Sequence, residues 1–215
     1  MDSSSFDVYA ILDIFLLLLI GVGPKIALVP FVELTAGMEP ATKALVLRKM
    51  LVTAAVVSVA LLLLGGLLSR LLHFSTGALS VASGLILVII AIGMVRGPSR
   101  EESEQRRADD RDPLETAVYP LAVPYLVNPA GIVVLVTASA DAASVGHIAV
   151  VFVLVAAVFA VDVVVFRWAN RVSDHLDQSR MLITEKVFGF LLAALAVQLM
   201  LNGLDAVGVI HLTGH

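Results

Sequence analysis

The sequence contains no cysteine and has few charged residues. The absence of cysteine among its 215 residues excludes structural disulfides, dithiol exchange and thiolate metal sites. Charged residues make up only 15% of the chain, whereas hydrophobic residues make up 59%. The apolar share lies well above the roughly 45–50% of a soluble globular domain, and the mean hydropathy is +0.98. The composition therefore indicates a membrane protein without a sizeable soluble domain.

Several short patterns that would assign a function are also missing. The first ten residues, MDSSSFDVYA, contain no Lys or Arg, so they lack the basic region of a cleavable signal peptide, and the first apolar run is expected to remain as a span. The sequence has no ATP-binding motif, no nucleophile–base pair and no histidine spacing typical of a metal site. We therefore expect no enzyme activity, no cofactor, no metal and no nucleic-acid partner.

Six apolar segments are long enough to cross a bilayer, which requires about 20 helical residues for about 30 Å of hydrocarbon. They are expected at residues 8–34, 50–69, 77–95, 114–139, 147–167 and 182–204. The hydrophilic stretch RGPSREESEQRRADDRDP is expected to be a solvated linker between two halves. The fold class expected is an all-α integral membrane protein with a first three-helix repeat over 1–97, a cytoplasmic linker over 98–113 and a second repeat over 114–215.

Lys and Arg residues are distributed unevenly among the expected connections. Twelve of the fourteen fall in the connections after the first, third and fifth spans, whereas Arg70 alone falls on the opposite side. The remaining one, Lys25, lies inside the first span. By the positive-inside rule the crowded side is cytoplasmic, so six crossings place both termini outside.

Two three-span halves must have opposite orientations, and the sequence carries traces of such an internal repeat. An offset of 105 residues relates Pro24 to Pro129, Gly84 to Gly189, and Ala91 to Ala196. The second and fifth spans show no such register. The shared offset predicts two inverted-topology repeats.

The dipeptides Gly23-Pro24 and Asn128-Pro129 interrupt the first and fourth spans near their middles. A proline within a span removes one backbone donor and frees a carbonyl one turn earlier, and unpaired backbone groups cost several kcal/mol in hydrocarbon. Asn128 can cap a helix, and either proline can occupy a first helical position. Both spans are therefore expected to be discontinuous, with two half-helix N-termini near the bilayer centre.

Two half-helix N-termini form an anion receptor, because each carries roughly half a positive charge and free N–H groups. A carboxylate is the expected guest, and freed carbonyls near Gly21 or Tyr125 would accept an ammonium group. The candidate substrate-binding residues are Gly23, Pro24, Lys25, Asn128, Pro129, Ala130 and Gly131. This arrangement is typical of a transporter built from inverted repeats.

Three ionisable residues at membrane depth are candidates for gating or proton coupling, because such residues are costly in lipid. Lys25 and Asp162 are expected at matching depths, where they could form a structural ion pair or a gate and proton-coupling element. Asp13, on the outer half of the first span, could serve a proton path or simply be hydrated.

Four stretches resemble the MarC family of bacterial inner-membrane proteins. They are PFVELT at 30–35, SGLILVIIAIGMVRG at 83–97, YPLAVPYLVNPAGIVVLVT at 119–137 and GFLLAALAVQLMLNGL at 189–204. The most specific is the pattern PLAxPxxxxP, formed by Pro120, Leu121, Ala122, Pro124 and Pro129. That family includes SnatA-type transporters of small neutral amino acids, within the LysE-like exporter superfamily. The resemblance implies six spans, paired halves and a substrate site at the breaks in spans one and four.

The first break departs from the family pattern, which usually reads D/N-P-x-G-x-x-P. Here Gly23 replaces the acid or amide, Lys25 is added, and the second proline, Pro30, comes one position late. The function expected is a gradient-driven secondary transporter that exports glycine, alanine or serine. The alternative is a non-transporting membrane scaffold or accessory subunit. The expected partners are the amino acid and the lipid bilayer, and a homo-oligomer is compatible with the sequence.

Overall fold

The computed structural model describes residues 8–97, 112–142, 144–172 and 178–211, and these ranges are helical apart from short connections. The elements are α1 (Val8–Gly21), α2 (Pro24–Leu34), α3 (Pro40–Leu72), α4 (Thr76–Arg96), α6 (Pro113–Thr116), η1 (Ala117–Leu126), α7 (Pro129–Ala140), α8 (Val145–Val172) and α9 (Gln178–Ala206). The described part of the chain is therefore all-α, as expected. The expected linker, except for its last two residues, lies outside the described ranges.

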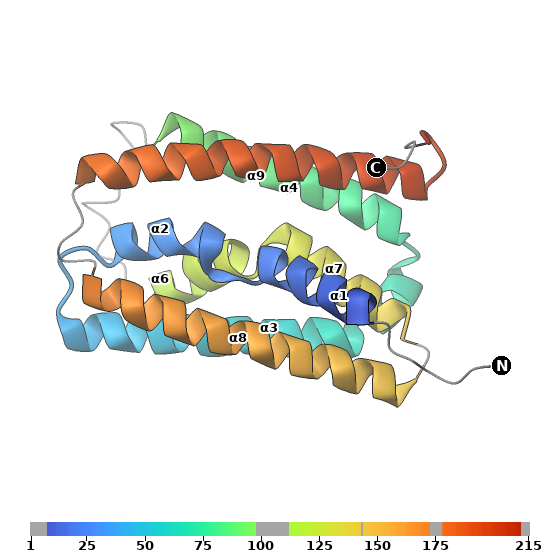
Figure 1. The fold of residues 1–215 in the computed structure, drawn as a ribbon, viewed down its shortest axis with the longest axis horizontal. Helices are drawn as coiled ribbons and strands as arrows, with labels where there is room; N and C mark the ends of the chain where they lie inside the picture. Colours follow the sequence, from blue (N-terminus) through green and yellow to red (C-terminus); the bar gives the residue numbers. More distant parts are fainter. Residues whose placement is uncertain (1–7, 98–111, 143, 173–177, 212–215) are drawn as a thin grey trace.

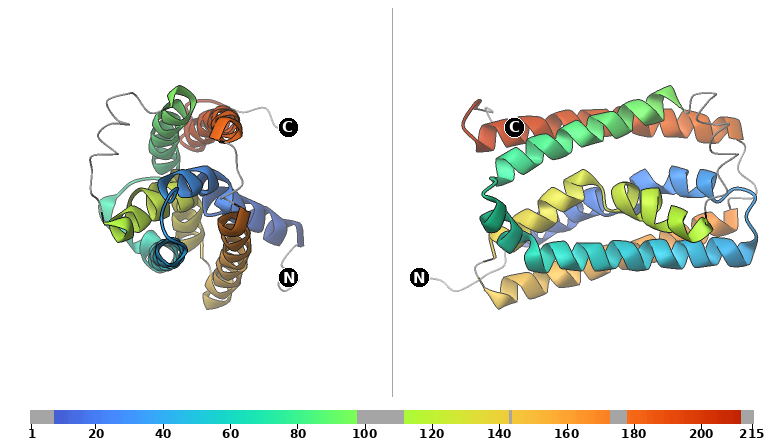
Figure 2. Two further views of the ribbon diagram at one scale, coloured as in Figure 1. Left: turned by 90° about the vertical axis from the view of Figure 1, so that its left-hand side faces the viewer. Right: turned by 180° about the vertical axis from the view of Figure 1, so that it is seen from behind.

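The helices form three layers (Figures 1 and 2). α4 and α9 make one outer layer, α3 and α8 make the other, and α1, α2, η1 and α7 lie between them. α1 begins and α9 ends at the same end of the bundle. Helices of the two sequence halves pack directly on each other, since α3 contacts α7 and α4 contacts α9. The middle layer thus contains both interrupted segments.

Five helical segments in the described ranges are long and apolar enough to cross a membrane, and a sixth counts if a bent pair forms one span. The five are Ile11–Leu34, Pro40–Leu72, Thr76–Arg96, Val145–Asn170 and Lys186–Ala206. The bent pair joins Pro113–Leu126 to Pro129–Ala140 at an angle of 69°. Because one span requires about 20 helical residues, neither α7 nor the stretch before it is long enough alone.

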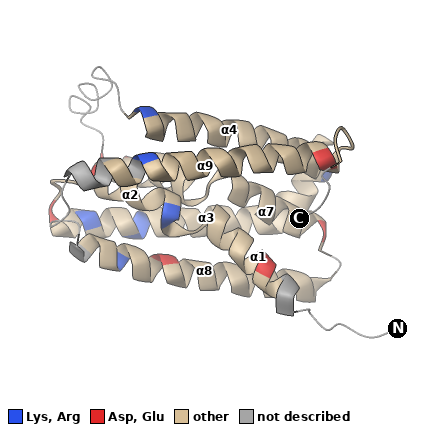
Figure 3. Ribbon diagram, turned by 45° about the horizontal axis from the view of Figure 1, so that its top comes forward, with Lys and Arg blue, Asp and Glu red and all other residues tan. Residues whose placement is uncertain are grey.

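The second span begins ten residues earlier than the sequence predicted. α3 starts at Pro40 rather than residue 50, and Lys43, Arg48 and Lys49 lie on this helix instead of in a loop. Hydropathy finds only the apolar part of a helix, whereas the backbone continues into polar turns beyond the hydrocarbon. Basic residues cluster toward the end of the bundle where α3 begins and α8 ends (Figure 3).

The first half of the fourth span is not a regular α-helix. η1 contains Pro120 and Pro124, and the backbone is extended at the residues before them, Tyr119 (φ −131°, ψ 123°) and Val123 (φ −135°, ψ 125°). This conformation is expected because a proline ring crowds the preceding residue out of the helical region. Regular helix resumes only at Pro129.

α4 and α9 pack as an antiparallel pair through small residues. At seven-residue intervals, Gly77 lies against Gly203, Gly84 against Ala196, and Ala91 against Gly189. A Cβ atom added at Gly84 would lie 2.7 Å from the carbonyl oxygen of Ala196, and one at Gly203 would lie 2.6 Å from that of Gly77. The glycines therefore allow the two backbones to touch, as small residues do in membrane helix pairs.

Candidate substrate site at the two helix starts

The first interruption lies between α1 and α2. α1 ends at Gly21, Val22 still donates its N–H to the Leu18 carbonyl at 2.7 Å, and α2 begins at Pro24. Gly23 occupies the N-cap position in an extended conformation (φ −82°, ψ 170°) and provides no side-chain cap. A Cβ atom here would overlap the carbonyl oxygen of Leu19. A side chain at this position would therefore require the end of α1 to shift.

The second interruption has the same cap geometry but a different chemistry. Asn128 is extended (φ −84°, ψ 166°), and its Oδ1 accepts the N–H of Gly131 at 3.1 Å, while Pro129 begins α7. The expected cap is therefore confirmed. Since Oδ1 satisfies one of the free N–H groups of the first turn, the start of α7 is partly occupied by its own side chain, whereas that of α2 is not.

Asn128 also joins the two interruptions. Its backbone N–H donates to the Gly21 carbonyl at 3.0 Å, and its Nδ2 donates to the Ile20 carbonyl at 2.9 Å. These carbonyls lie in the last turn of α1, where the helix itself has no backbone N–H left to donate to them. Asn128 is completely buried. The Gly21 carbonyl, expected to accept a substrate ammonium group, is thus already bonded within the protein.

Two glycines bring the interrupted segments into backbone contact. A Cβ atom added at Gly21 would overlap the Cα atom of Gly131, and one added at Gly131 would overlap the carbonyl oxygen of Gly21. The expected close approach at Gly131 is therefore found, but the approaching group is the backbone of the other half. Gly21 was expected to contribute only its carbonyl, but it contributes to this backbone contact as much as Gly131 does. In the sequence, the only sign of this contact was the second glycine, Gly23, two residues after Gly21.

An ion pair between Lys25 and Asp162, one of the two arrangements considered for them, is absent among the described residues. The Lys25 side chain is exposed, and neither carboxylate oxygen of Asp162 has a hydrogen-bond partner. Ala27, on the same turn of α2, is fully buried. Lys25 is two positions away, which turns it about 200° around the helix, away from the face that packs inside. Asp13 is exposed on α1.

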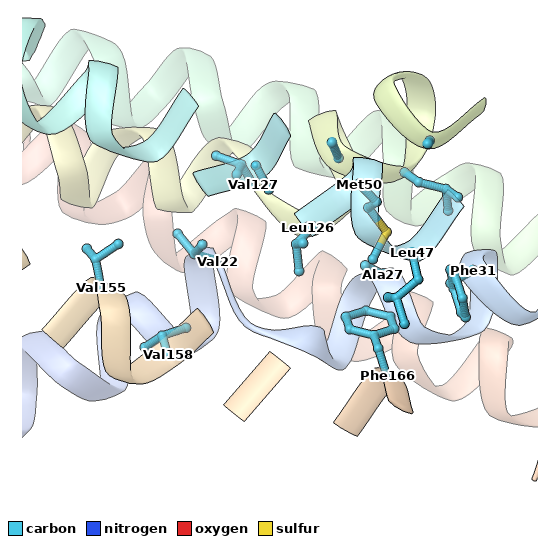
Figure 4. Close-up of a cluster of buried hydrophobic side chains, with 14 of the residues drawn as sticks. Val22, Ala27, Phe31, Leu47, Met50, Leu126, Val127, Val155, Val158 and Phe166 are labelled. Carbon is cyan, nitrogen blue, oxygen red and sulfur yellow. The ribbon is translucent and has the colours of Figure 1, made fainter. Parts of the chain in front are cut away.

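Asp162 lies on the buried face of α8. That face repeats at intervals of three and four residues through Val151, Val155, Val158, Asp162, Phe166 and Ala169. The ring of Phe166 meets that of Phe31 on α2 edge to face, with centroids 5.3 Å apart. Val158 and Phe166 point into a cluster with Val22, Ala27 and Leu126 (Figure 4). Asp162 therefore lies on the face of α8 that packs into this cluster, which includes Val22, Ala27, Leu126, Val158 and Phe166 and is called the first core cluster below.

Ser58 is another buried residue whose side chain has no hydrogen-bond partner, and the sequence did not single it out. Its Oγ has no hydrogen-bond partner, and the side chain is fully buried on α3 between Ala54 and Leu62. The repeat of buried residues every four positions could have drawn attention to it. A serine is small and weakly polar, however, so hydropathy alone does not distinguish it from its neighbours.

The residues just after the two helix starts face the outer layer of α4 and α9. Ile26 and Ala130 belong to a second core cluster, completed by Leu87, Ala91, Met94, Leu192 and Ala196. Tyr125 is half-buried and packs against both core clusters. The helix starts therefore lie at the boundary between the α4–α9 pair and the remaining helices.

The sequence is similar to membrane proteins from bacteria and archaea. It is 28% identical over 204 residues to the UPF0056 membrane protein YvbG of Bacillus subtilis, covering 93% of this chain and 94% of that protein. It is 27% identical over 175 residues to a UPF0056 membrane protein of Methanocaldococcus jannaschii, covering 81% and 85% of the two chains. No solved structure matches. Residues 8–207 match the family described as MarC family integral membrane protein. Since this match includes every described helix, from Val8 to Ala206, the protein belongs to the MarC family.

Proposed function

We propose that the protein is a secondary transporter that exports small neutral amino acids, of the glycine, alanine and serine class, across the bacterial inner membrane. The observation that carries the proposal is the junction of two helix starts in the middle layer, where Asn128 bonds to Ile20 and Gly21. Broken helices at membrane depth place backbone groups and helix dipoles where a small charged solute can use them.

The start of α2 is the preferred place for the substrate carboxylate. Gly23 gives no side-chain cap, and Pro24 has no N–H, so the backbone N–H groups of Lys25 and Ile26 are those that a first turn leaves for an anion. The Lys25 side chain, exposed beside this turn, adds a positive charge. At α7, Asn128 already accepts the Gly131 N–H. Gly23, Pro24 and Lys25 thus remain proposed ligands, whereas Asn128, Pro129, Ala130 and Gly131 hold the junction.

An inverted repeat with discontinuous first and fourth spans is part of this proposal, and two relationships support it. The caps at Gly23 and Asn128 are 105 residues apart and have nearly equal backbone angles. The contact of Gly84 with Ala196 is matched by the contact of Gly189 with Ala91, each residue again displaced by 105. Exchange of the two halves therefore maps the α4–α9 contact onto itself.

The proposed orientation places both termini outside. It rests on the basic residues that gather toward the end of the bundle where α3 begins (Figure 3), because that end is then cytoplasmic by the positive-inside rule. A secondary transporter also needs no nucleotide-binding segment, and the sequence has none.

Flux measurements on purified protein in liposomes test the proposal. Radiolabelled glycine, alanine and serine should cross the membrane in a protein-dependent way, and a substrate should raise the melting temperature of the detergent-solubilised protein by mass action. Lys25→Met should weaken binding, whereas Gly93→Ala, at a glycine with no atom within 4 Å of an added Cβ, should not. If all twenty amino acids leave both flux and melting temperature unchanged, the scaffold alternative is favoured.

A further inference from the structure

We propose that Asp162 is the proton-binding group of this protein, and that it takes up a proton when the helices close around it and releases it when they open. The inference rests on the proposed function for its role in transport. The proton-binding site itself rests on burial and packing alone. Asp162 is fully buried, and both of its carboxylate oxygens lack a hydrogen-bond partner among the described residues.

The neighbours of Asp162 on its own helix offer no compensation for a negative charge. One turn before it lies Val158 and one turn after it lies Phe166, both fully buried in the first core cluster. An ionised carboxylate enclosed by apolar side chains without a donor is costly, whether in a protein core or in a membrane. A bound proton removes this cost and needs no additional space.

The charged groups on the helices packed against α8 do not neutralise Asp162. They are Asp13 on α1, Lys25 and Glu33 on α2, and Lys43, Arg48, Lys49 and Arg70 on α3. α7, which also packs against α8, has no ionisable side chain. None of these groups bonds to the Asp162 carboxylate, since both oxygens are without a partner.

The depth of Asp162 matches the start of α2. α1, α2 and α8 run in the same direction (Figure 1), and the Phe31–Phe166 ring contact fixes their register. Ala27 lies four residues before Phe31, and Asp162 lies four residues before Phe166. Asp162 is therefore at the depth of Ala27, one turn into α2. Val22 and Val158 belong to the same core cluster as these rings (Figure 4). A proton at Asp162 is therefore held at the depth where the substrate carboxylate is proposed to bind.

A proton fits this position better than a metal cation. Na⁺ or Ca²⁺ would need several oxygen ligands, whereas the side chains one turn away from Asp162 are a valine and a phenylalanine. The proton comes from water, forms an O–H bond with the carboxylate, and returns to water on the side to which the helices open. No net charge is buried when the helices close, because the proton neutralises the carboxylate that the cluster encloses.

The test combines infrared spectroscopy with transport by the full chain. Asp162→Asn resembles the protonated carboxyl in shape and carries no charge. In wild-type protein at pH 7, where exposed Asp and Glu are ionised, we expect a protonated-carboxyl C=O band that disappears in D162N. In liposomes, a pH gradient should drive glycine accumulation by the wild type, whereas D162N should only equalise the two glycine concentrations. Asp141→Asn, at an exposed acid that follows the last turn of α7, is the matched control and should keep both properties.

The outcomes separate the proton site from the transport function. A protonated-carboxyl band that persists in D162N, or is absent from the wild type, overturns the proton site, as does undiminished accumulation by D162N. The proton site would also be overturned if a Na⁺ gradient, and not a pH gradient, drove glycine accumulation by the wild type and D162N lost that accumulation. If the wild type moves no glycine while its band depends on Asp162, the proposed function fails and the proton site stands. Should D162N not fold, the wild-type band at pH 7 still decides.

Discussion

The side-chain amide of Asn128 donates to the Ile20 carbonyl at 2.9 Å, although the two residues are 108 positions apart. The same side chain caps α7 through the Gly131 N–H. One residue therefore ends a helix in the first half of the chain and begins a helix in the second. Loss of its amide leaves a carbonyl at the end of α1 and an N–H at the start of α7 without these partners.

Asn128→Ala should lower the free energy of unfolding by about 1–3 kcal/mol, because a buried donor and a buried acceptor each lose a bond. Asn128→Ser is the matched variant, since a serine hydroxyl still caps a helix but is too short to replace the bond to Ile20. Denaturation of the solubilised protein should rank wild type, N128S and N128A in decreasing stability. If N128S and N128A are equally stable, the cap of α7 contributes nothing, and the loss of stability comes only from the bond between Asn128 Nδ2 and the Ile20 carbonyl.

Gly131→Ala should be strongly destabilising, by about 3 kcal/mol or more, because the added Cβ atom overlaps the Gly21 carbonyl and overpacking of backbone against backbone is not easily relieved. Gly93→Ala tests the same substitution on α4 without a neighbour within 4 Å, and the higher helix propensity of alanine should leave that variant as stable as wild type or more so. Similar melting temperatures for G131A and wild type would show that the two interruptions are not in contact.

Gly84→Ala and Gly189→Ala should both destabilise the α4–α9 pair. A Cβ atom at Gly84 would lie 2.7 Å from the Ala196 carbonyl, and one at Gly189 would lie 2.8 Å from Val95 Cγ2 and 3.2 Å from the Ala91 carbonyl. Because a side chain yields more readily than backbone, we expect the larger loss for Gly84, by about 1–3 kcal/mol. The measurement is thermal unfolding, and an unchanged midpoint for both variants would contradict the packing.

Lys25→Met should change the free energy of unfolding by no more than about 0.5 kcal/mol, since the lysine is exposed and its ion pair with Asp162 is absent. If the lysine attracts the substrate carboxylate, KM for transport should rise while kcat changes less. Stability and transport kinetics measured on the same preparation separate the two roles. A large loss of stability would instead restore a structural function for this residue.

Prolines and a capping residue in the sequence predicted where helices start, but they could not predict which distant segments pack together. Proline and a capping asparagine act within a few residues, so α2 at Pro24 and α7 at Pro129 could be placed from the sequence. The bond from Asn128 to Ile20 depends on how two distant segments pack, and no local rule contains it. The ion pair of Lys25 with Asp162, one of the two roles considered for these residues, does not form, because matching depth fixes position along a helix but not direction around it.

Hydropathy predicted the number of apolar segments better than their limits. It placed the start of the second span at residue 50, although α3 begins at Pro40, because a helix end outside the hydrocarbon can be polar. It also gave no sign of the extended backbone at Tyr119 and Val123, which the prolines that follow them explain.

The junction of Gly21, Gly131 and Asn128 is a poor place for the molecule to bend, since its backbones touch and its carbonyls are bonded. The α4–α9 pair meets the first turns of α2 and α7 through the apolar side chains of Ile26 and Ala130, which can slide without breaking a hydrogen bond. The junction is therefore the rigid contact of the middle layer, and the apolar surface toward α4 and α9 is the contact that can adjust.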